Sequence, residues 1–408
     1  MAIVRNDSFL NEVWLMERIG IYSGTFNPVH VGHLQGAQYA LKTLALSKIL
    51  MIPDRIPPHK QLPAASADVS RRLEMLRLAC EDSPSLEVCD PAACEEAPSY
   101  TCHTVAAVRG QYPNARLFLL MGGDMLPKFP DWVEAERILK EVTLAVFRRG
   151  GKNEEETALA AKERIEAMGG QAILLDNPAV DISSTQLRRM LVFGCASEFI
   201  PKAVEAYIDR GGLYGTGEDY RNLPIEKLEQ VVVSLLKPNR VKHVLGCAQT
   251  AVELARLYGV NETDAHRAAL LHDITKALDG PLQLTLCRSY GRILDDFSAK
   301  NPKTLHALTG SLVAERIFGE NPAVVDAICC HTTGKADMNL LEKIIYVADY
   351  MEPNRDFPGV EELRRLAYED ITQALKLGLQ MTLSLLTQQG RDISPESRDA
   401  LLFLENNS

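Results

Sequence analysis

The 408-residue sequence lacks any run of about 18 uninterrupted apolar residues, which is the length that a membrane helix needs. Its first residues, MAIVRNDSFLNEVWLMER, place charged side chains inside what would have to be the apolar core of a signal peptide. Neither a membrane span nor a secretion signal is therefore indicated. These absences predict a cytoplasmic protein that does not bind membranes.

An excess of positive charge is also missing. The net charge of −10 at pH 7 argues against a broad nucleic-acid-binding surface, but it leaves room for small basic pockets that bind phosphate ligands. The nine cysteines include no C-x-x-C pair, so neither a zinc ribbon nor a redox motif is indicated, and we expect buried free thiols. Low-complexity tracts and internal repeats are absent, which leaves an ordinary globular protein.

The two halves of the sequence differ in pattern. In the first half, short apolar runs alternate with helical patterns, which predicts a parallel sheet with helical crossovers, a Rossmann-like α/β fold. In the second half the strand signal disappears and apolar residues recur at three- and four-residue spacing, which predicts an all-α domain. The expected strands are RIGIYS, KILMIP, LEVCD, ARLFLLMGG, VTLAVFRR and QAILLD.

The boundary between the halves is expected in GGLYGTGEDYRNLP, where glycines, an acidic pair and a proline gather. The predicted parts are an N-terminal extension at 1–17, an α/β domain at 18–214, a linker at 215–225, an all-α domain at 226–390 and a C-terminal tail at 391–408.

The segment GIYSGTFNPVHVGHL follows the first expected strand and places two histidines three residues apart. Gly24 lets a phosphate approach the backbone closely, and Pro28 sets the turn before a helix that we expect to begin at residues 29–31. The free N–H groups and dipole at a helix start favour an anion. His30 and His33 would point at that anion from one face of the helix and donate hydrogen bonds or charge to phosphate oxygens.

A second anion-binding pattern, VDISSTQLRR, lies much further along the chain. Ser183, Ser184 and Thr185 are typical of the cap and first turn of a helix, and Arg188 lies one turn on, where it can reach the same ligand. Alone this pattern indicates only a helix cap. Together with the first loop it indicates a specific site for phosphates.

The motif H-x-G-H, combined with I-S-S-T-x-x-R, resembles the nucleotidyltransferase superfamily of adenylyl- and cytidylyltransferases. Within it, the segments IPPHK, APSYTCHTV and LMGGDMLPKFPDW resemble nicotinate-nucleotide adenylyltransferase, over about residues 18–214. The resemblance implies transfer of AMP from ATP to nicotinate mononucleotide, a step of NAD biosynthesis that yields nicotinate adenine dinucleotide and pyrophosphate. The preference between nicotinate and nicotinamide mononucleotide stays open.

The resemblance also implies roles for individual residues. The ATP phosphates would be held by His30, His33, Lys60 and Arg188, with Mg²⁺ shielding the leaving pyrophosphate. The pyridine pocket would be shaped by Tyr100, Thr101 and Trp132, and Asp124 would accept ribose hydroxyls. Further ATP- and substrate-binding positions would be Gly24, Thr25, Phe26, Gly122, Ser183, Ser184 and Thr185.

Two alternatives remain for this half. Tyr100 and Trp132 are also compatible with simple core packing, since aromatic side chains bury well. The acceptor could be another compound, such as pantetheine phosphate, although the P-P-H-K and S-Y-T segments count against it. Ser23, Asn27 and the pair at 102–103 depart from the family pattern, and His103 leaves the ligand-facing side of its helix undecided.

In the all-helical half, histidines and aspartates follow apolar runs in VKHVLG, RAALLHDITK, TLHALTG, AICCHTTG and IIYVADYMEP. Burying a polar group unpaired costs about a few kcal/mol, so these groups must be hydrogen-bonded or coordinated. Any one of them fits a capped core position, but a metal site would satisfy all of them together. The candidate ligands are His243, His272, Asp273, His306, His331 and Asp349.

This order of residues resembles the HD-domain phosphohydrolases, and its two additional histidines match the binuclear members. The resemblance implies that Asp273 bridges two metal ions and takes part in catalysis. Imidazole and carboxylate ligands without thiolates suit two transition-metal ions such as Fe or Mn. Lys276 and Arg355 would bind flanking phosphates, although both are equally compatible with a solvated surface.

More narrowly, LLHDITK, LHALTG, CHTTG and YVADYMEPNR resemble small bacterial HD hydrolases that cleave diadenosine tetraphosphate symmetrically into two ADP, over about residues 226–390. The alternatives are another nucleotide substrate, or a nucleotide-binding regulatory module without turnover. The expected partners are therefore ATP, nicotinate mononucleotide and diadenosine tetraphosphate, whereas the oligomeric state cannot be predicted.

Overall fold

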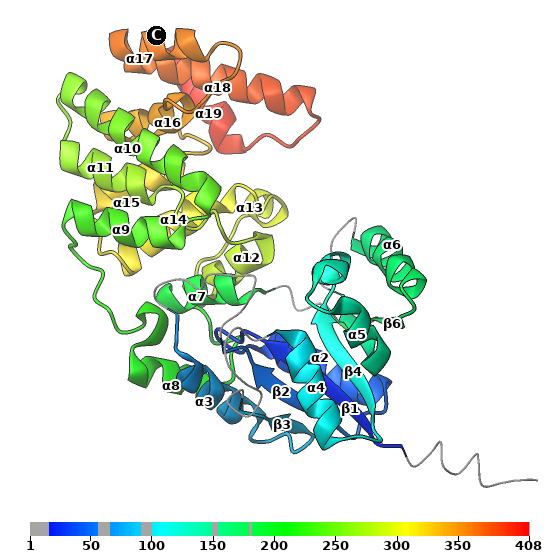
Figure 1. The fold of residues 1–408 in the computed structure, drawn as a ribbon. Helices are drawn as coiled ribbons and strands as arrows, with labels where there is room; N and C mark the ends of the chain where they lie inside the picture. Colours follow the sequence, from blue (N-terminus) through cyan, green and yellow to red (C-terminus); the bar gives the residue numbers. More distant parts are fainter. Residues whose placement is uncertain (1–15, 56–65, 91–99, 149–153, 179–181, 408) are drawn as a thin grey trace, which may run out of the picture. The chain divides into compact units, whose positions relative to one another are not determined.

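The computed structural model describes residues 16–55, 66–90, 100–148, 154–178 and 182–407. The chain divides into two compact units, Met1–Gly217 and Glu218–Ser408 (Figure 1). No helix in the described ranges is both long and apolar enough to cross a bilayer. Most of the described cysteines are buried free thiols, while Cys89 and Cys329 are half-buried.

A six-stranded parallel sheet forms the centre of the first unit, in the strand order β3-β2-β1-β4-β5-β6. Each segment expected to be a strand forms one, so the prediction of a parallel α/β fold is confirmed. The strands are β1 (Arg18–Gly24), β2 (Lys48–Pro53), β3 (Leu86–Val88), β4 (Arg116–Gly122), β5 (Val142–Phe147) and β6 (Ala172–Leu175).

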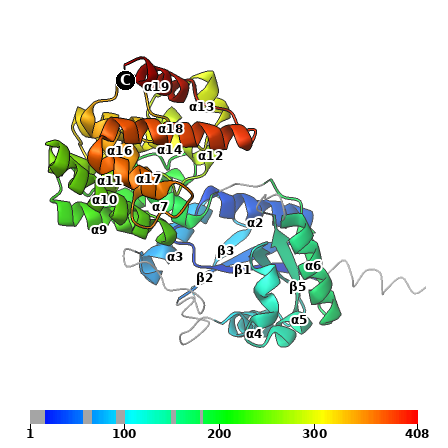
Figure 2. The same cartoon turned by 90° about the horizontal axis from the view of Figure 1, so that it is seen from above.

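Helices cover both faces of this sheet (Figure 2). The core on one face joins apolar side chains of the strands to those of α4, α5 and α6, while α2 and α3 contact the sheet from the other. The helices are α2 (Val31–Thr43), α3 (Val69–Cys80), α4 (Thr101–Gln111), η2 (Leu126–Asp131), α5 (Ala135–Glu141), α6 (Glu154–Ala167), α7 (Ser184–Val192), α8 (Lys202–Gly211) and η3 (Leu213–Gly215).

The strand order reverses direction between β1 and β4, which are neighbours in the sheet. The chain leaves β1 toward one edge of the sheet and leaves β4 toward the other. Open α/β sheets bind ligands at this switch point, outside the carboxyl ends of the strands. The loops after Gly24 and after Gly122 therefore border the same candidate crevice.

The second unit is all-helical among its described residues, as expected from the periodicity of the sequence. Its core lies among α10, α11, α14, α15 and α16, which pack closely on one another. The helices are α9 (Ile225–Leu235), α10 (Pro238–Tyr258), α11 (Glu262–Leu271), α12 (Gly280–Ser289), α13 (Asp296–Lys300), α14 (Leu305–Arg316), α15 (Pro322–Cys330), α16 (Leu340–Met351), α17 (Val360–Glu369), α18 (Ile371–Gln388) and α19 (Pro395–Asn406).

The segment expected to be a C-terminal tail differs from that expectation, because most of it forms α19. Ala400 and Leu404 of this helix are buried, and the Ser397 hydroxyl donates to the carbonyl of Thr333 at 2.7 Å. The helix therefore belongs to the packed unit and braces the loop that follows α15.

Candidate functional sites

Two histidines lie side by side at the start of α2. His30 is the N-cap residue, and its backbone N–H donates to Nδ1 of His33 at 3.2 Å. In the neutral His33 ring the proton is thereby placed on Nε2, where it can serve as a donor. The two ring centroids are 3.6 Å apart. The structure thus brings together the two imidazoles of the H-x-G-H motif beside a helix N-terminus, the kind of position that favours anions.

The loop between β1 and α2 holds Phe26 in an unusual conformation. Its φ is +44°, a left-handed value that a bulky residue adopts only when its surroundings impose it. The buried ring packs edge-on against Tyr22 and against His33, with centroids 5.4 and 5.0 Å away. A Cβ at Gly24 would meet the Phe26 ring at no closer than 3.5 Å, so protein packing alone does not require glycine at that position.

The I-S-S-T segment reaches this same loop. Ser183 caps α7 by accepting the N–H of Gln186, which confirms the helix cap expected there. The Ser184 hydroxyl donates to the carbonyl of Pro28 at 3.1 Å. Arg188 donates to the carbonyl of Asn27 at 2.6 Å and to the Thr185 hydroxyl at 3.1 Å. The two motifs, far apart in sequence, are therefore joined by direct hydrogen bonds.

Two further residues, Tyr214 and Arg72, support the loop. Asn27 is buried, and its Oδ1 accepts a hydrogen bond from the Tyr214 hydroxyl at 2.8 Å. Arg72 is 1% exposed and donates to three carbonyls, including that of Thr25 at 2.7 Å. Burial lowers the pKa of Arg72 and raises that of Tyr214. No local motif marks either residue, because each acts on a loop that is distant in sequence.

The residues expected to bind the acceptor nucleotide lie on segments that follow strands. Tyr100 is the N-cap of α4 and Thr101 its first residue, while His103 on the same turn is exposed. Trp132 packs on Phe129 with ring centroids 5.1 Å apart, so part of its surface serves core packing. Asp124, two residues after β4, is exposed. Lys60 and the P-P-H-K segment lie outside the described residues.

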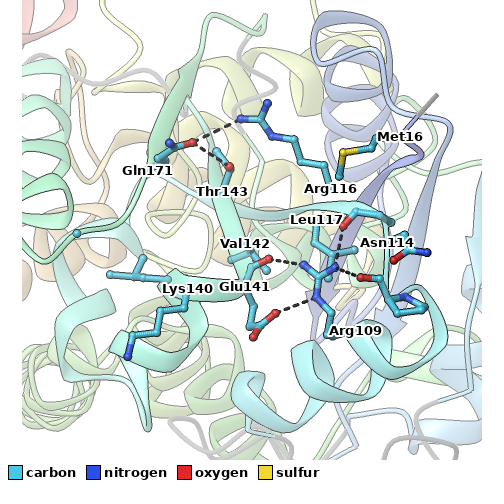
Figure 3. A pocket seen from close by; sticks show the side chains of 14 residues that line it. Met16, Arg109, Asn114, Arg116, Leu117, Lys140, Glu141, Val142, Thr143 and Gln171 are labelled. Carbon is cyan, nitrogen blue, oxygen red and sulfur yellow. Dashed lines mark hydrogen bonds and ion pairs between the residues drawn. The ribbon is translucent and has the colours of Figure 1, made fainter. Parts of the chain in front are cut away.

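A cavity of about 850 Å³ lies at the N-terminal ends of β4 and β5, away from the carboxyl ends of the strands where the predicted site residues lie (Figure 3). No residue predicted to form a site lines it. Arg109 points into this region, but its guanidinium donates to the carboxylate and carbonyl of Glu141 and to the carbonyl of Ala115. These hydrogen bonds connect α4 to the chain segments before β4 and β5.

In the second unit, the structure brings all six predicted metal ligands together. They come from five helices or their ends: His243 from α10, His306 from α14 and Asp349 from α16, with His272 and His331 at the C-caps of α11 and α15 and Asp273 directly after His272. Three overlapping groups of side chains have ligand atoms close enough to share an ion. The groups are His243, His272 and Asp273; His272, His331 and Asp349; and Asp273, His306 and His331.

Asp273 lies in the middle of this cluster and is 1% exposed. Its Oδ2 is 3.8 and 3.7 Å from the Nε2 atoms of His243 and His272. Its Oδ1 is 3.5 and 3.9 Å from those of His306 and His331. The two carboxylate oxygens thus face two different pairs of imidazoles, which is the geometry required of a bridging ligand.

All four histidines turn their Nε2 atoms to the centre because their Nδ1 atoms have partners elsewhere. Nδ1 of His272, His306 and His331 lies 2.6 to 2.9 Å from the carbonyl three residues earlier in the chain. Nδ1 of His243 lies 3.2 Å from Oε1 of Glu352. Such partners fix the tautomer of metal-binding histidines.

The electrostatics of the cluster suit metal ions. Burial lowers the pKa of His331 to about 4 and those of His272 and His306 well below their usual value, so these rings are neutral and have a lone pair to donate. Oδ1 of Asp273 is buried without a hydrogen bond from any described residue, which is costly unless a ligand satisfies it. The donor set of imidazoles and carboxylates therefore fits divalent transition-metal ions.

Three cations surround the cluster. Arg355 donates to Oδ1 of Asp349 at 2.9 Å, and Nζ of Lys276 lies 2.7 Å from Nε2 of His306. Burial lowers the pKa of Lys276 to about 8. Arg240, which the sequence analysis did not identify, donates to Oδ2 of Asp273. Together they surround the acidic centre with groups that can bind phosphate oxygens.

Both sites lie in regions of the chain that are similar to known proteins. Residues 21–190 match the cytidylyltransferase-like family. The probable nicotinate-nucleotide adenylyltransferase of Caldicellulosiruptor saccharolyticus is 35% identical over 203 residues, which cover 48% of this chain and 98% of that protein. The chain belongs to the nicotinate-nucleotide adenylyltransferase family. In this family member the matched region contains the H-x-G-H loop and most of α7, whose hydrogen bonds are described above.

The chain carries a second domain, since residues 240–354 match the HD domain. The symmetrical bis(5'-nucleosyl)-tetraphosphatase of Halalkalibacterium halodurans is 39% identical over 172 residues, which cover 42% of this chain and 91% of that protein. A solved structure from Clostridium acetobutylicum, described as a predicted HD superfamily hydrolase involved in NAD metabolism, is 36% identical with a TM-score of 0.45, covering 46% of this chain and 99% of that one. The matched HD region contains all six residues of the cluster.

Proposed function

We propose that this chain carries two enzymes, and that its first domain transfers the adenylyl group of ATP to nicotinate mononucleotide. The observation that supports it most is the hydrogen-bonded contact of the two anion-binding motifs, in which Arg188 and Ser184 bind the loop that leads to His30 and His33. The reaction is an in-line attack of the mononucleotide phosphate on the α-phosphorus of ATP, so the protein has to align the reactants and neutralise charge.

In this reaction His30, His33, Lys60 and Arg188 hold the triphosphate and stabilise the pyrophosphate as it leaves. Mg²⁺ bound with ATP supplies further positive charge there. Gly24, Thr25 and Phe26 form the loop beside the triphosphate, and the first turn of α7, Ser183 to Thr185, contributes donors. No residue needs to form a covalent intermediate, because the attacking group belongs to the acceptor.

Tyr100, Thr101 and Trp132 are proposed to bind the pyridine ring, with Gly122 and Asp124 beside the ribose. A panel of acceptors tests this assignment. The purified chain is incubated with ATP, Mg²⁺ and either nicotinate mononucleotide, nicotinamide mononucleotide or pantetheine phosphate. We expect nicotinate adenine dinucleotide and pyrophosphate to form fastest; faster adenylylation of pantetheine phosphate would contradict the proposed acceptor.

For the second domain, we propose hydrolysis of diadenosine tetraphosphate into two ADP at a binuclear metal centre. The main support is the position of Asp273, whose two oxygens face two separate pairs of imidazoles. Two divalent ions bound at such a cluster lower the pKa of a water and neutralise phosphate oxygens. Their proposed ligands are His243, His272, Asp273, His306, His331 and Asp349.

The chain itself contributes binding and orientation. Lys276, Arg355 and Arg240 are placed to hold the phosphates that flank the cleaved bond, and their positive charges stabilise the negative charge that develops there. A symmetrical cut requires that the middle of the tetraphosphate be held over the cluster, with the outer phosphates on these cations.

Product analysis tests this second activity. The metal-loaded chain is incubated with diadenosine tetraphosphate, and the nucleotides are separated. We expect ADP alone. ATP together with AMP would contradict a symmetrical cut, and binding without any product would favour the alternative of a regulatory module without turnover.

A further inference from the structure

The six proposed ligands form two unequal groups. We define the first position as His243, His272, Asp349 and Oδ2 of Asp273, and the second position as His306, His331 and Oδ1 of Asp273. From the contacts behind these ligands we infer that Glu352, which is not itself a ligand, is a positioning residue that makes the first position bind its metal ion more tightly. This inference rests on the proposed binuclear centre.

Among the residues that the structure describes, Glu352 is the only carboxylate that contacts Nδ1 of any of the four histidines. Its Oε1 lies 3.2 Å from Nδ1 of His243, whereas the other three imidazoles face backbone carbonyls. The Glu352 side chain is 1% exposed, so water screens its charge little. A hydrogen bond to a carboxylate is stronger than one to a neutral carbonyl and makes the imidazole a better donor to a metal ion.

Several contacts hold the Glu352 carboxylate in this place. Its Oε2 accepts the backbone N–H and the side-chain amide of Asn354, at 2.7 and 2.8 Å. The same Asn354 amide also donates to the carbonyl of Lys242, the residue before His243. Arg364 donates to the Glu352 carbonyl at 3.0 Å. Such a fixed carboxylate holds the His243 ring in one orientation.

Gly246, one turn after His243 on α10, makes room for this carboxylate. A Cβ at this position would lie 2.5 Å from Oε2 of Glu352, closer than such atoms can approach. Glycine inside a helix usually reduces helix stability relative to alanine. At this position the close approach of Glu352 explains why the helix contains a glycine.

The charges around the two positions also differ. The first position contains the carboxylates of Asp273 and Asp349, and Oδ1 of Asp349 lies 3.0 Å from Nε2 of His243, which Glu352 contacts from behind. The second position shares only Asp273, and the ammonium of Lys276 lies 2.7 Å from Nε2 of His306. The additional carboxylate favours a divalent cation at the first position, whereas Arg240 and Arg355, which donate to Asp273 and Asp349, oppose it.

A Mn²⁺ titration of the full-length, metal-free chain tests the inference, with free Mn²⁺ measured by electron paramagnetic resonance. For the unmodified chain we expect two ions bound with unequal affinities. In Glu352→Gln the tighter ion should bind about 10- to 100-fold more weakly, the usual effect of losing such a partner, while the weaker ion should be unaffected.

Glu342→Gln is the matched control. Glu342 is also 1% exposed and lies on α16, but its carboxylate contacts Lys335 and the backbone of Asn339. We expect this variant to bind both ions as the unmodified chain does. A purely structural effect of losing a buried glutamate would appear in both variants.

Gly246→Ala provides a second route, because its methyl group displaces the Glu352 carboxylate without changing its chemistry. It should weaken the same ion, and it decides the matter if Glu352→Gln fails to fold. An equal loss of both ions, or no change in either variant, would overturn the role of Glu352. Fewer than two ions in the unmodified chain would instead contradict the binuclear centre itself.

Discussion

Replacing Asp273 by asparagine removes the negative charge at the centre of the cluster while keeping the size of the side chain. The carboxylate oxygens lie 3.5 to 3.9 Å from the Nε2 atoms of four histidines, two on each side. Asparagine can present its oxygen to only one of these sides and must present an NH₂ group, which cannot bind a cation, to the other. We therefore expect one metal position to be lost and the other to be weakened.

The magnitude follows from what each position loses. Removing a partner that only supports a ligand already costs about 10- to 100-fold in metal affinity, so removal of a charged ligand should cost at least about 100-fold. A 100-fold loss corresponds to about 2.7 kcal/mol. Hydrolysis of diadenosine tetraphosphate should fall by at least as much, because the proposed reaction needs both positions.

The fold of the metal-free variant should persist. Asp273 is paired with Arg240 and Lys276, whose side chains are 24% and 40% exposed and can be solvated when the carboxylate is gone. Asp370→Asn is a suitable control, because Asp370 caps α18 in the same unit and asparagine caps helices equally well. Metal content is measured by inductively coupled plasma mass spectrometry, and an unchanged content in Asp273→Asn would refute the ligand assignment.

Three further predictions concern other parts of the chain. His33→Ala should reduce adenylyl transfer at least about 100-fold, the usual cost of removing one donor to developing charge, and should leave hydrolysis intact; an active variant in a coupled pyrophosphate assay would contradict the role of His33. Tyr214→Phe should leave the buried Oδ1 of Asn27 without its 2.8 Å hydrogen bond and destabilise the first domain by about 1 to 3 kcal/mol, as measured by urea denaturation, and an unchanged midpoint would count against this support. The metal-free second domain should lose stability as the pH falls from 6.5 toward 4. In this range the unfolded chain takes up a proton at His331, whereas the folded chain, in which the pKa of His331 is about 4, does not. Unfolding is followed by circular dichroism, and a pH-independent stability in this range would show that the ring is not buried in its neutral form.

The elements that the sequence predicted well are those with strong local signals. Each of the six apolar runs of the first half forms a strand, and the helix after Pro28 begins at Val31. The cluster of four histidines and two aspartates was also predictable, because polar residues directly after apolar helical runs have to be satisfied in the core. Here local pattern and tertiary structure agree.

The residues that the sequence analysis missed act across long separations in the chain. Tyr214 contacts Asn27, and Glu352 contacts His243, but neither pair has a shared local pattern. Arg240 and Arg72 also lack a local pattern, and an arginine on a helix usually points to solvent, so neither was predicted. The helix α19 was not predicted, because its packing against the loop at Thr333 is a tertiary effect.

We propose that one chain carries two independent phosphate chemistries at two separate sets of residues. Both reactions can be assayed in the same preparation for the unmodified chain, His33→Ala and Asp273→Asn. We expect the unmodified chain to form both nicotinate adenine dinucleotide and ADP, His33→Ala to form only ADP from diadenosine tetraphosphate, and Asp273→Asn to form only the dinucleotide. Loss of both products in either single variant, or the absence of one product from the unmodified chain, would contradict the claim.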